Sequence, residues 1–422
     1  MDFSLEYTDE QEEFAKEVRK WLDENVPKDL ESPRDVLKMS YEQWQKRREL
    51  GRKLGDKGWL YPSYPRKYGG GGLDADHGVV LRQELAERHL NLPPYYDSGR
   101  LASPAILATG TEEQKERFLP PMLTGKALTW QLFTEPEAGT DEANQQTNAF
   151  RHVREKDHFI INGQKIFVGG LYAPPDQFLL LTRSDLEAPR HQNLAMFLAP
   201  ANLPGITIQP LDLFPAGTFG QTCSLTADGA PGVKHSVFFD DVKIPDSYLI
   251  GGEREGWRVT TATLTVEHGD REDTGSESGG QVGAAWIPRN MVVEKFLEHC
   301  KSNPYVVKRL KENPQLLDNV VNVYIDAQIE RLLSMRNAWL PRSGKRAAYA
   351  GPQLQMFSKN FGARLANDIA QVLGPLTMTD DTEWSPDDGI FEVTQRAGVC
   401  FAPAGTPEAS KIIISRALAI GR

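Results

Sequence analysis

The chain carries Thr134-Glu-Pro-Glu-Ala-Gly-Thr-Asp141 directly after the apolar run 128–133. Pro136 stiffens a bend in the backbone, and Gly139 frees the backbone to approach a ligand closely. The hydroxyls of Thr134 and Thr140 stand beside main-chain donors, which suits a polar heterocycle or a phosphate. Because an ordinary surface turn has a similar composition, the segments on either side decide between these two interpretations.

Short β-rich runs surround this stretch. The runs 178–182, 195–198 and 236–239 are separated by Pro, Gly and Asp residues typical of turns. A further run from Phe159 to Val168 contains Asn162-Gly163, which indicates a strand, a turn and a second strand. The sequence therefore predicts a small β domain from 128 to 248.

Helical spacing occupies the rest of the chain. In the first 127 residues, capping boxes open at Thr8 and Thr111, and Val79 to Leu90 has helical spacing. After residue 248 the helical period returns, interrupted by the Gly-, Ser- and acid-rich segment 269–283, which we expect to be a loop. The clearest repeat is Leu354, Phe357, Phe361, Leu365, Ile369 and Val372. The pattern predicts three domains, with boundaries 1–127, 128–248 and 249–422.

The composition argues against several kinds of function. The net charge is −10 and no basic cluster is present, so we expect no nucleic-acid partner. The 8 histidines show neither HExxH nor paired spacing, so we expect no metal site. The glycines at 69–72 lack a preceding strand and a following Lys-Ser/Thr pair, which indicates a tight turn rather than a phosphate site.

The cysteines and the N-terminus indicate a cellular compartment. The 3 cysteines lack CxxC spacing, which is typical of reduced thiols in a cytosol. Residues 1–6 are acidic and lack the apolar core of a signal peptide. No apolar run approaches the roughly 20 residues of a membrane helix. We therefore expect a soluble, cytoplasmic protein that does not bind membranes.

Several segments together resemble the acyl-CoA dehydrogenase family, and they occur in the order typical of that family. Their order along nearly the whole chain implies the family's α+β multidomain fold. This fold has an N-terminal helical domain, a central small β-barrel or sandwich domain and a C-terminal four-helix bundle. The segments are Gly58-Trp-Leu60 with Pro65-Arg-Lys-Tyr-Gly-Gly70, then 134–141, Asn162-Gly-Gln-Lys165, Val237 to Pro245 with Gly256-Trp257, and Ala404-Gly-Thr-Pro-Glu408 with Ile412 to Arg416.

The resemblance implies an FAD-dependent α,β-dehydrogenation of an acyl-CoA thioester to the 2-enoyl-CoA. A base removes the α proton and the β hydrogen leaves as a hydride. No side chain accepts hydride reversibly, so a cofactor is required. The chain has no GxGxxG fingerprint, so FAD is implied by the resemblance alone. The resemblance also implies a homodimer or tetramer whose FAD is reoxidised by an electron-transferring flavoprotein.

The resemblance also implies which residues contact the flavin. Phe167 and Gly169 stand where the family often has Trp and Thr, so a hydroxyl donor is lost at Gly169. Pro375 replaces a second glycine and removes an N–H donor. The predicted residues are Gln131, Phe133, Thr134, Gly139 and Thr140 in the loop, Phe167 and Gly169 on the next strand, Gln371 and Gly374 in a segment that reaches a neighbouring subunit's cofactor, and Thr406 and Glu408 near the adenine.

The predicted base is Glu267. Many family members place a glutamate directly before the C-terminal Gly-Thr, but this chain has Ala404 there, and alanine takes no proton. A branch that includes the isovaleryl-type enzymes uses a glutamate on the helix after Gly-Trp, at the position of Glu267. Burial beside a flavin and a thioester would raise its pKa towards working pH. The alternative is a solvated glutamate at a helix end. Thr140 and His268, which replaces the usual arginine, are predicted to contact the substrate.

Departures from the family pattern keep two other functions open. The Arg-x-x-Phe-Gly segment that holds the FAD pyrophosphate is absent, and 303–310 stands in its place with Lys308 and Arg309 as candidate replacements. The departures from the family pattern at Gly169 and His268 are compatible with a flavin-dependent oxidase or monooxygenase of the same fold. The missing arginine segment and Pro375 are compatible with a non-catalytic subunit of a hetero-oligomeric dehydrogenase. No local motif in the sequence identifies the acyl group of the substrate.

Overall fold

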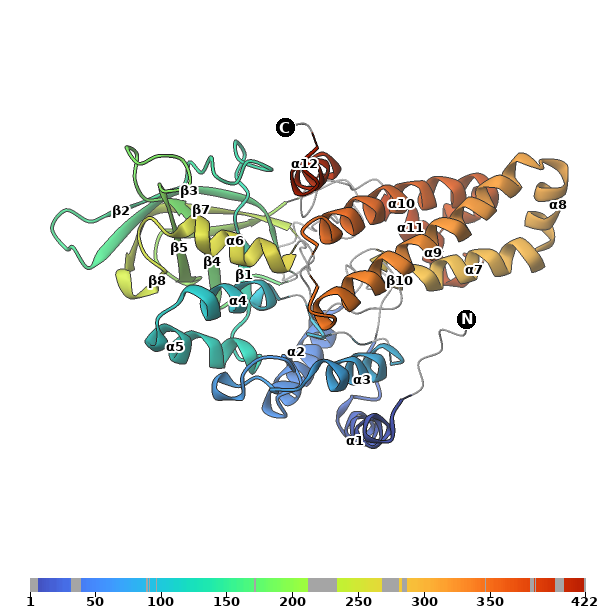
Figure 1. The fold of residues 1–422 in the computed structure, drawn as a ribbon, viewed down its shortest axis with the longest axis horizontal. Coiled ribbons are helices and arrows are strands. Elements are labelled where there is room, and N and C mark those ends of the chain that lie inside the picture. The colour runs from blue at the N-terminus through green and yellow to red at the C-terminus, as the bar shows by residue number, and fades with distance from the viewer. Residues whose placement is uncertain are drawn as a thin grey trace.

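The computed structural model describes residues 7–31, 39–88, 90, 92–95, 97–170, 172–211, 234–267, 281–282, 287–345, 347–379, 383, 385–398 and 406–420. Figure 1 shows the N-terminal helices beneath a sheet domain at one end of the molecule and a bundle of long helices at the other. The expected architecture of N-terminal helices, a central sheet and C-terminal helices is confirmed. Helix gives way to strand between Leu123 and Thr129, and strand to helix between Ile250 and Gly256. We propose the domain boundaries 1–127, 128–248 and 249–422 in or beside these transitions.

The N-terminal domain contains helices whose starts follow from their caps. Both capping boxes form, with Gln11 N donating to Thr8 Oγ1 at 3.3 Å and Gln114 N to Thr111 Oγ1 at 3.2 Å. The helices are α1 (Asp9–Asn25), α2 (Tyr41–Asp56), α3 (Ala75–Ala86), α4 (Gly99–Thr109) and α5 (Glu112–Leu123), with the short 3₁₀ helix η2 (Arg66–Tyr68).

One predicted helix is displaced and the glycine turn is confirmed. The segment predicted to run from Val79 to Leu90 is α3, which begins earlier because Asp74 caps it and ends at Ala86. At the glycine run, φ is +96° for Gly69, and a Cβ on Gly70 would lie 2.3 Å from the Tyr64 carbonyl oxygen. These glycines are therefore required by a tight turn and by close main-chain packing.

The central domain is one eight-stranded sheet with the order β6-β7-β3-β2-β4-β5-β8, in which β1 pairs in parallel with β4. Alternate residues of β4 and β5 lie in two cores. Leu179 and Leu181 pack with the N-terminal helices, whereas Phe178 and Leu180 pack within the sheet domain. The strands are β1 (Thr129–Leu132), β2 (Asn148–Arg151), β3 (His158–Gly169), β4 (Gln177–Arg183), β5 (Leu194–Pro200), β6 (Ile206–Pro210), β7 (Lys234–Pro245) and β8 (Leu249–Ile250), with the 3₁₀ helix η3 (Asp246–Tyr248).

The strand-turn-strand prediction for 159–168 is wrong, because β3 continues through this segment as a single strand. Asn162 and Asp241 on β7 exchange hydrogen bonds of 2.9 and 2.8 Å, which keeps the two strands paired at this point. The register shifts between Ile161 and Gly163, so the Asn-Gly pair forms an irregularity against β7 instead of a hairpin turn.

The C-terminal domain contains the longest helices. The predicted repeat lies on α10, where Phe361, Leu365, Ile369 and Val372 are buried. Two short strand pairings were not predicted, because a two-residue strand is too short to show an alternating pattern. One involves β8, which lies beyond residue 248 and pairs with β5. The other joins β9 (Gln281–Val282), in the expected loop 269–283, to β10 (Ile287–Pro288). The helices are α6 (Gly256–Glu267), α7 (Arg289–Ser302), α8 (Pro304–Glu312), α9 (Gln315–Arg342), α10 (Ala350–Leu373), η4 (Gly374–Thr377), η5 (Pro386–Gly389), α11 (Ile390–Gly398) and α12 (Pro407–Ala417).

None of the helices in the described ranges combines the length and the apolar character that a membrane crossing would need.

Candidate active site

The loop 134–141 is closed on itself and attached to β3. Glu135 N donates to Ala138 O at 2.9 Å, and Ala138 N donates to Glu135 O at 3.1 Å. Ile166 N on β3 donates to Thr134 O at 3.0 Å, which places the start of the loop beside Phe167. The strand pairing therefore brings two predicted groups of flavin-contacting residues together.

A buried ionic cluster holds this loop in place, and we name Glu135, Gln145 and Lys165 the loop anchor. Lys165 Nζ donates to Glu135 Oε1 at 2.7 Å, to Phe133 O at 3.2 Å and to Gln145 Oε1. The Glu135 carboxylate also accepts main-chain N–H bonds from Gln146 at 2.6 Å and Thr147 at 3.0 Å. Both charged side chains are almost fully buried. Such a pair is stable only because its polar atoms are satisfied.

The loop anchor shifts the pKa values of both partners. Burial lowers the pKa of Lys165 to about 8, against the opposing effect of Glu135. Burial alone would raise the pKa of Glu135, but Lys165 and the main-chain donors bring it below its usual range. At neutral pH the carboxylate is therefore ionised and held by a cation. Sequence reasoning missed the anchor, because Glu135 and Lys165 belong to separate motifs that only the folded strands join.

Phe167 is an exposed aromatic side chain in a strained backbone conformation. Its φ is +56°, which is uncommon for a residue with a side chain, and its side chain is 49% exposed. The register between β3 and β7 shifts between Lys165 and Val168, so a bulge produces this conformation. Strain of this kind is often kept at ligand sites. The position fits an aromatic that covers a flavin ring.

The other predicted loop residues differ in exposure. Gly139 and Thr140 are exposed, and a Cβ added to Gly139 would meet nothing within 4 Å. Neither its φ nor protein packing therefore requires glycine at 139, and the space in front of it is open to a ligand. Thr134 and Gln131 are half-buried, and Phe133 is buried in the core.

Gly169 and its neighbour lie against two buried polar rings. A Cβ on Gly170 would lie 1.9 Å from the Trp130 ring, so Gly170 admits no side chain. Trp130 stacks on His235 with ring centroids 4.7 Å apart. Within the described residues, Trp130 Nε1 and His235 Nδ1 have no hydrogen-bond partner. Gly169 is buried and pairs with Lys234 in the register of β7, so its lost hydroxyl is not replaced on β3 itself.

The predicted base lies at the end of α6. Figure 1 shows α6 across the sheet domain next to α4, with one end directed toward the helical bundle. A Cβ on Gly256 would lie 2.6 Å from Ala195 N, so glycine allows α6 to approach β5. Trp257 stacks on His191 with centroids 4.4 Å apart. Glu267 is the last residue of α6, whereas its side chain, His268 and Ala404 lie outside the described part of the chain.

Gln371 and Gly374 lie away from the loop. Figure 1 shows this end of α10 beside α8, on the side of the bundle opposite the sheet domain. Arg309 on α8 donates to the main-chain oxygens of Val372 at 3.1 Å and Gln371 at 2.8 Å, so this arginine caps α10. Lys308 is exposed and pairs weakly with Glu312 at 3.7 Å. A single chain therefore does not bring these residues together with the loop 134–141.

Thr406 and Glu408 lie at the start of α12. Thr406 caps the helix, accepting from Ala409 N at 3.2 Å, and the exposed Glu408 lies 3.7 Å from Lys411. Ser410 Oγ donates to Gln355 Oε1 at 3.3 Å, which places α12 on the first half of α10. In Figure 1, α12 lies between the sheet domain and the bundle.

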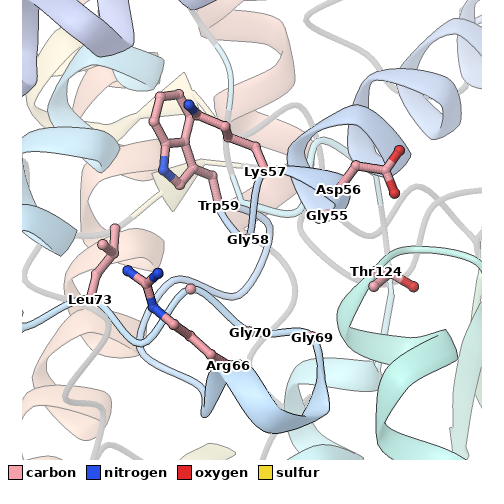
Figure 2. Close-up of a pocket in the computed structure, with 11 residues that line it drawn as sticks. Gly55, Asp56, Lys57, Gly58, Trp59, Arg66, Gly69, Gly70, Leu73 and Thr124 are labelled. Carbon is pink, nitrogen blue, oxygen red and sulfur yellow. The ribbon is translucent and has the colours of Figure 1, made fainter.

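An open cavity of about 360 Å³ lies elsewhere, on the N-terminal domain (Figure 2). It is bordered by the glycine turn 69–71, Arg66, Leu73, Trp59 and Lys57. The Lys57 ammonium pairs with Glu17 at 2.8 Å and lies 5.0 Å from the centre of the Trp59 ring. None of the predicted site residues lines it, so the site is identified by the loop and not by this cavity. The described residues also contain no cluster of His, Cys, Asp or Glu that would hold a metal ion.

The residues present fit one face of a flavin site. Open space before Gly139, the exposed ring of Phe167 and the anchored loop between them form a surface that admits a planar heterocycle. Trp130 on β1 has a buried Nε1 without a hydrogen-bond partner among the described residues. The predicted cofactor-contacting residues Gln371, Gly374, Thr406 and Glu408 lie on other elements and not on this surface.

Known proteins resemble this chain in sequence and in fold. The family model described as "Acyl-CoA dehydrogenase, N-terminal domain" matches residues 8–126, and "Acyl-CoA dehydrogenase, middle domain" matches 131–229. FadE29 of Mycobacterium tuberculosis is 31% identical over 265 residues, which is 62% of this chain and 62% of FadE29. IpdE1 of Mycolicibacterium smegmatis is 30% identical over 313 residues, 72% of this chain and 75% of IpdE1. Both relatives are named acyl-CoA dehydrogenases.

Solved structures share the fold over the whole chain. The "Tcur3481-Tcur3483 steroid ACAD" has a TM-score of 0.76 and 23% identity and covers 100% of both chains. The ChsE4-ChsE5 complex from Mycobacterium tuberculosis has a TM-score of 0.72 and 22% identity and likewise covers 100% of both. The family models, the relatives and the fold lead to one conclusion: the chain belongs to the acyl-CoA dehydrogenase family, whose cofactor is FAD.

Proposed function

We propose that this protein oxidises an acyl-CoA thioester to the 2-enoyl-CoA. The observation that carries the proposal is the anchored loop 134–141 beside the exposed ring of Phe167, an arrangement that supports the flavin-contacting surface expected of the family. The chain spans 62% of the length of FadE29, so the activity and substrate of that relative are not transferred as a whole.

In the proposed reaction, Glu267 acts as the base. It takes the α proton of the thioester as the β hydrogen leaves with its electron pair. Bound FAD supplies the acceptor for this hydride. The position of Glu267 at the end of α6 supports the assignment, because α6 packs on β4 and β5 of the sheet that carries the loop. Thr140 and His268 are proposed to contact the thioester and the CoA arm.

The proposed cofactor contacts fall into three groups. Gln131, Phe133, Thr134, Gly139, Thr140, Phe167 and Gly169 are proposed to bind the flavin half. Thr406 and Glu408 are proposed to lie near the adenine. Gln371 and Gly374 are proposed to contact the cofactor of another subunit, because they lie at the α8 end of the bundle.

A separate electron-transferring flavoprotein is the proposed electron acceptor. The alternative is a flavin-dependent oxidase or monooxygenase of the same fold, which the buried Gly169 without a hydroxyl favours. Oxygen consumption with acyl-CoA in the absence of an electron carrier distinguishes the two. A non-catalytic subunit remains the third candidate, since the ChsE4-ChsE5 structure is a complex of two named chains.

The absorption spectrum of the purified protein, followed by anaerobic titration with acyl-CoAs, tests the proposed function. We expect a yellow protein whose flavin band is bleached by at least one thioester. The panel should include straight-chain, branched and steroid acyl groups, because one structure of this fold is described as a steroid ACAD. A colourless protein that takes up no added FAD would contradict the proposal and favour the non-catalytic subunit.

A further inference from the structure

The bulge of β3 that carries Phe167 lies opposite a buried histidine. Two residues of β3 stand opposite the single residue Ser236 of β7, and Phe167 is one of the two. The regular pairing resumes at Val168, whose partner on β7 is His235. A β-bulge changes the direction of the side chain that it carries and leaves the extra residue unpaired. The contacts that fix this bulge therefore fix the direction of the Phe167 ring.

The side chain of His235 is bonded to the main chain at the end of the bulge. It forms a hydrogen bond with the main chain of Val168. Its Nδ1 has no partner in the described part of the chain, so Nε2 is the N–H donor to the Val168 carbonyl oxygen. His235 is 3% exposed and Val168 is 2% exposed, so this bond is shielded from water. The loss of a buried hydrogen bond is costly, because water does not replace the missing partner.

Trp130 on β1 fixes the orientation of the histidine ring. The two rings stack with an angle of 27° between their planes, and Trp130 is fully buried. The same indole lies against Gly170, where an added Cβ would be 1.9 Å from the ring. Residues 168 and 170 share one face of β3, because side chains alternate along a strand. On this core face, His235 therefore contacts the chain at Val168 and Trp130 contacts it at Gly170.

Phe167 differs from Val168 in exposure and in backbone conformation. Its side chain is half exposed, whereas that of Val168 is buried in the core of the sheet domain. A φ of +56° is uncommon for a residue with a side chain, so the surrounding contacts have to maintain it. The hydrogen bond from His235 is one such contact, because it holds the next residue along the chain. His235 therefore acts on the position of the Phe167 ring through the backbone.

We propose that His235 is a positioning residue, which holds the bulge of β3 from the core so that Phe167 presents its ring to the flavin. Trp130 assists it, because the stack keeps the His235 N–H directed at Val168. The role of Phe167 towards the flavin rests on the proposed function, whereas the contacts behind the bulge do not. The alternative is a histidine that only fills space in the core. The loss of such a residue would lower stability without acting through Phe167.

Two substitutions separate the donor of His235 from its ring. His235→Phe keeps an aromatic ring that can stack on Trp130 but has no N–H. His235→Gln loses the ring but places an N–H as many bonds from Cα as Nε2 is in histidine. FAD affinity is measured by titrating the FAD-free protein and following the quenching of flavin fluorescence. We expect it to fall on the order of tenfold in His235→Phe, the equivalent of one hydrogen bond, and to be largely retained in His235→Gln.

A double-mutant cycle shows whether His235 acts through Phe167. Phe167→Gly removes the ring, so adding His235→Phe to it should cost no further FAD affinity. Phe159→Leu is the matched control for a general loss of stability. Phe159 is buried near the other end of β3 and packs on Phe197 with ring centroids 5.2 Å apart. Its truncation should lower stability and leave FAD affinity unchanged.

Hydrogen exchange tests the contact without a cofactor. In the FAD-free protein, peptides that cover 166–170 should exchange faster in His235→Phe than in the unsubstituted protein, because the bulge opens locally more often. Peptides that cover β4 should exchange at an unchanged rate. This readout uses neither FAD nor a thioester. It therefore still decides whether His235 holds the bulge if the protein takes up no flavin and the proposed function fails.

Any of four results would overturn the proposal. The first two are an unchanged FAD affinity in His235→Phe and an equal loss of affinity when the ring of Phe167 is already absent. The third is unchanged exchange at 166–170 in His235→Phe. The fourth is a loss of affinity in His235→Gln as large as that in His235→Phe, because the N–H donor would then have no role.

Discussion

At the residue scale, the buried Glu135–Lys165 pair fixes the loop 134–141, which we propose contacts the flavin. Replacing Lys165 with Met leaves the Glu135 carboxylate buried without its cation. Removing one partner of a buried pair costs roughly 3–5 kcal/mol. We expect a loss of this size in the free energy of unfolding, measured by urea titration, together with weaker FAD binding.

A second lysine–glutamate pair in the same sheet domain is the control for this prediction. Lys243 on β7 pairs with Glu155, and both side chains are about half exposed. Exposed pairs contribute about 0–1 kcal/mol, so Lys243→Met should be nearly neutral. In the double variant Glu135→Gln with Lys165→Met, part of the loss should be recovered. If Lys165→Met cost no more than Lys243→Met, the anchor would have no special role.

His235 makes the stability of the sheet domain dependent on pH. Burial lowers its pKa to about 4, so the folded state keeps the ring neutral where the unfolded chain, with a pKa near 6.5, takes a proton. Stability is therefore full above pH 6.5 and is lost as the pH falls from 6.5 towards 4. The shift corresponds to a contribution on the order of 3 kcal/mol.

Urea titrations at pH 7 and pH 4.5 measure this contribution. His235→Gln cannot titrate, so it should lose less stability over this interval than the unsubstituted protein does. Equal losses in the two proteins would show that His235 titrates normally and that its burial does not control the acid response.

Substitutions of Phe167 test cofactor binding separately from the stability of the fold. Glycine adopts a φ of +56° without strain, so Phe167→Gly should change the free energy of unfolding by no more than about 1 kcal/mol in either direction. The same change removes the exposed ring and should weaken FAD binding. Phe167→Trp should retain FAD. Unchanged FAD affinity in Phe167→Gly would show that the ring does not cover the cofactor.

Single residues also show what sequence alone reveals. Gly139 was predicted from a local pattern, a glycine in a loop beside hydroxyls, and the space around it is open in the structure. The partnership of Lys165 with Glu135 was not predictable, since it depends on how β3 returns beside the loop 30 residues earlier. No local sequence pattern around Arg309 distinguishes an arginine that caps a helix from one that contacts the FAD pyrophosphate.

At the scale of elements, α6 depends on the glycine at its start. A Cβ on Gly256 would overlap the backbone of β5 at Ala195, so Gly256→Ala should push the helix away from the sheet. Overpacking of this kind typically costs 1–3 kcal/mol. We expect a lower melting temperature and slower flavin reduction, because the predicted base lies on α6.

Gly78→Ala is the control for this change. Gly78 lies within α3, and the atom nearest to its added Cβ is 3.5 Å away, so alanine should leave stability unchanged or raise it by up to about 1 kcal/mol. If Gly256→Ala behaved like Gly78→Ala, the close approach of α6 to β5 would not matter.

Helices were predictable from the sequence where their hydrophobic repeat extends over several turns or where a cap marks their start. The capped helices α1 and α5 and the repeat on α10 follow from spacing and caps, and the structure confirms them. The Asn162-Gly163 pair was assigned to a hairpin turn because that dipeptide favours one. Pairing with β7 outweighs this local preference, since the strand gains main-chain hydrogen bonds on both sides of the irregularity.

At the scale of the whole molecule, the order of motifs along the chain predicted the architecture. The three-part arrangement follows from the change of hydrophobic period near residues 128 and 248. The distribution of the predicted flavin-contacting residues over separate parts of the chain was not visible in the sequence except through the family resemblance. In Figure 1 the sheet domain, which carries the loop, is separated from the end of α10 beside α8, where Gln371 accepts a hydrogen bond from Arg309. A second chain would therefore complete what one chain leaves apart.

The most direct measurement is anaerobic reduction of Glu267→Gln by acyl-CoA. If Glu267 is the base, the purified variant should be yellow and bind FAD with unchanged affinity, yet the thioester that bleaches the unsubstituted protein should leave its flavin band intact. Full bleaching of the Glu267→Gln flavin by that thioester would contradict the account, because another group would then remove the α proton.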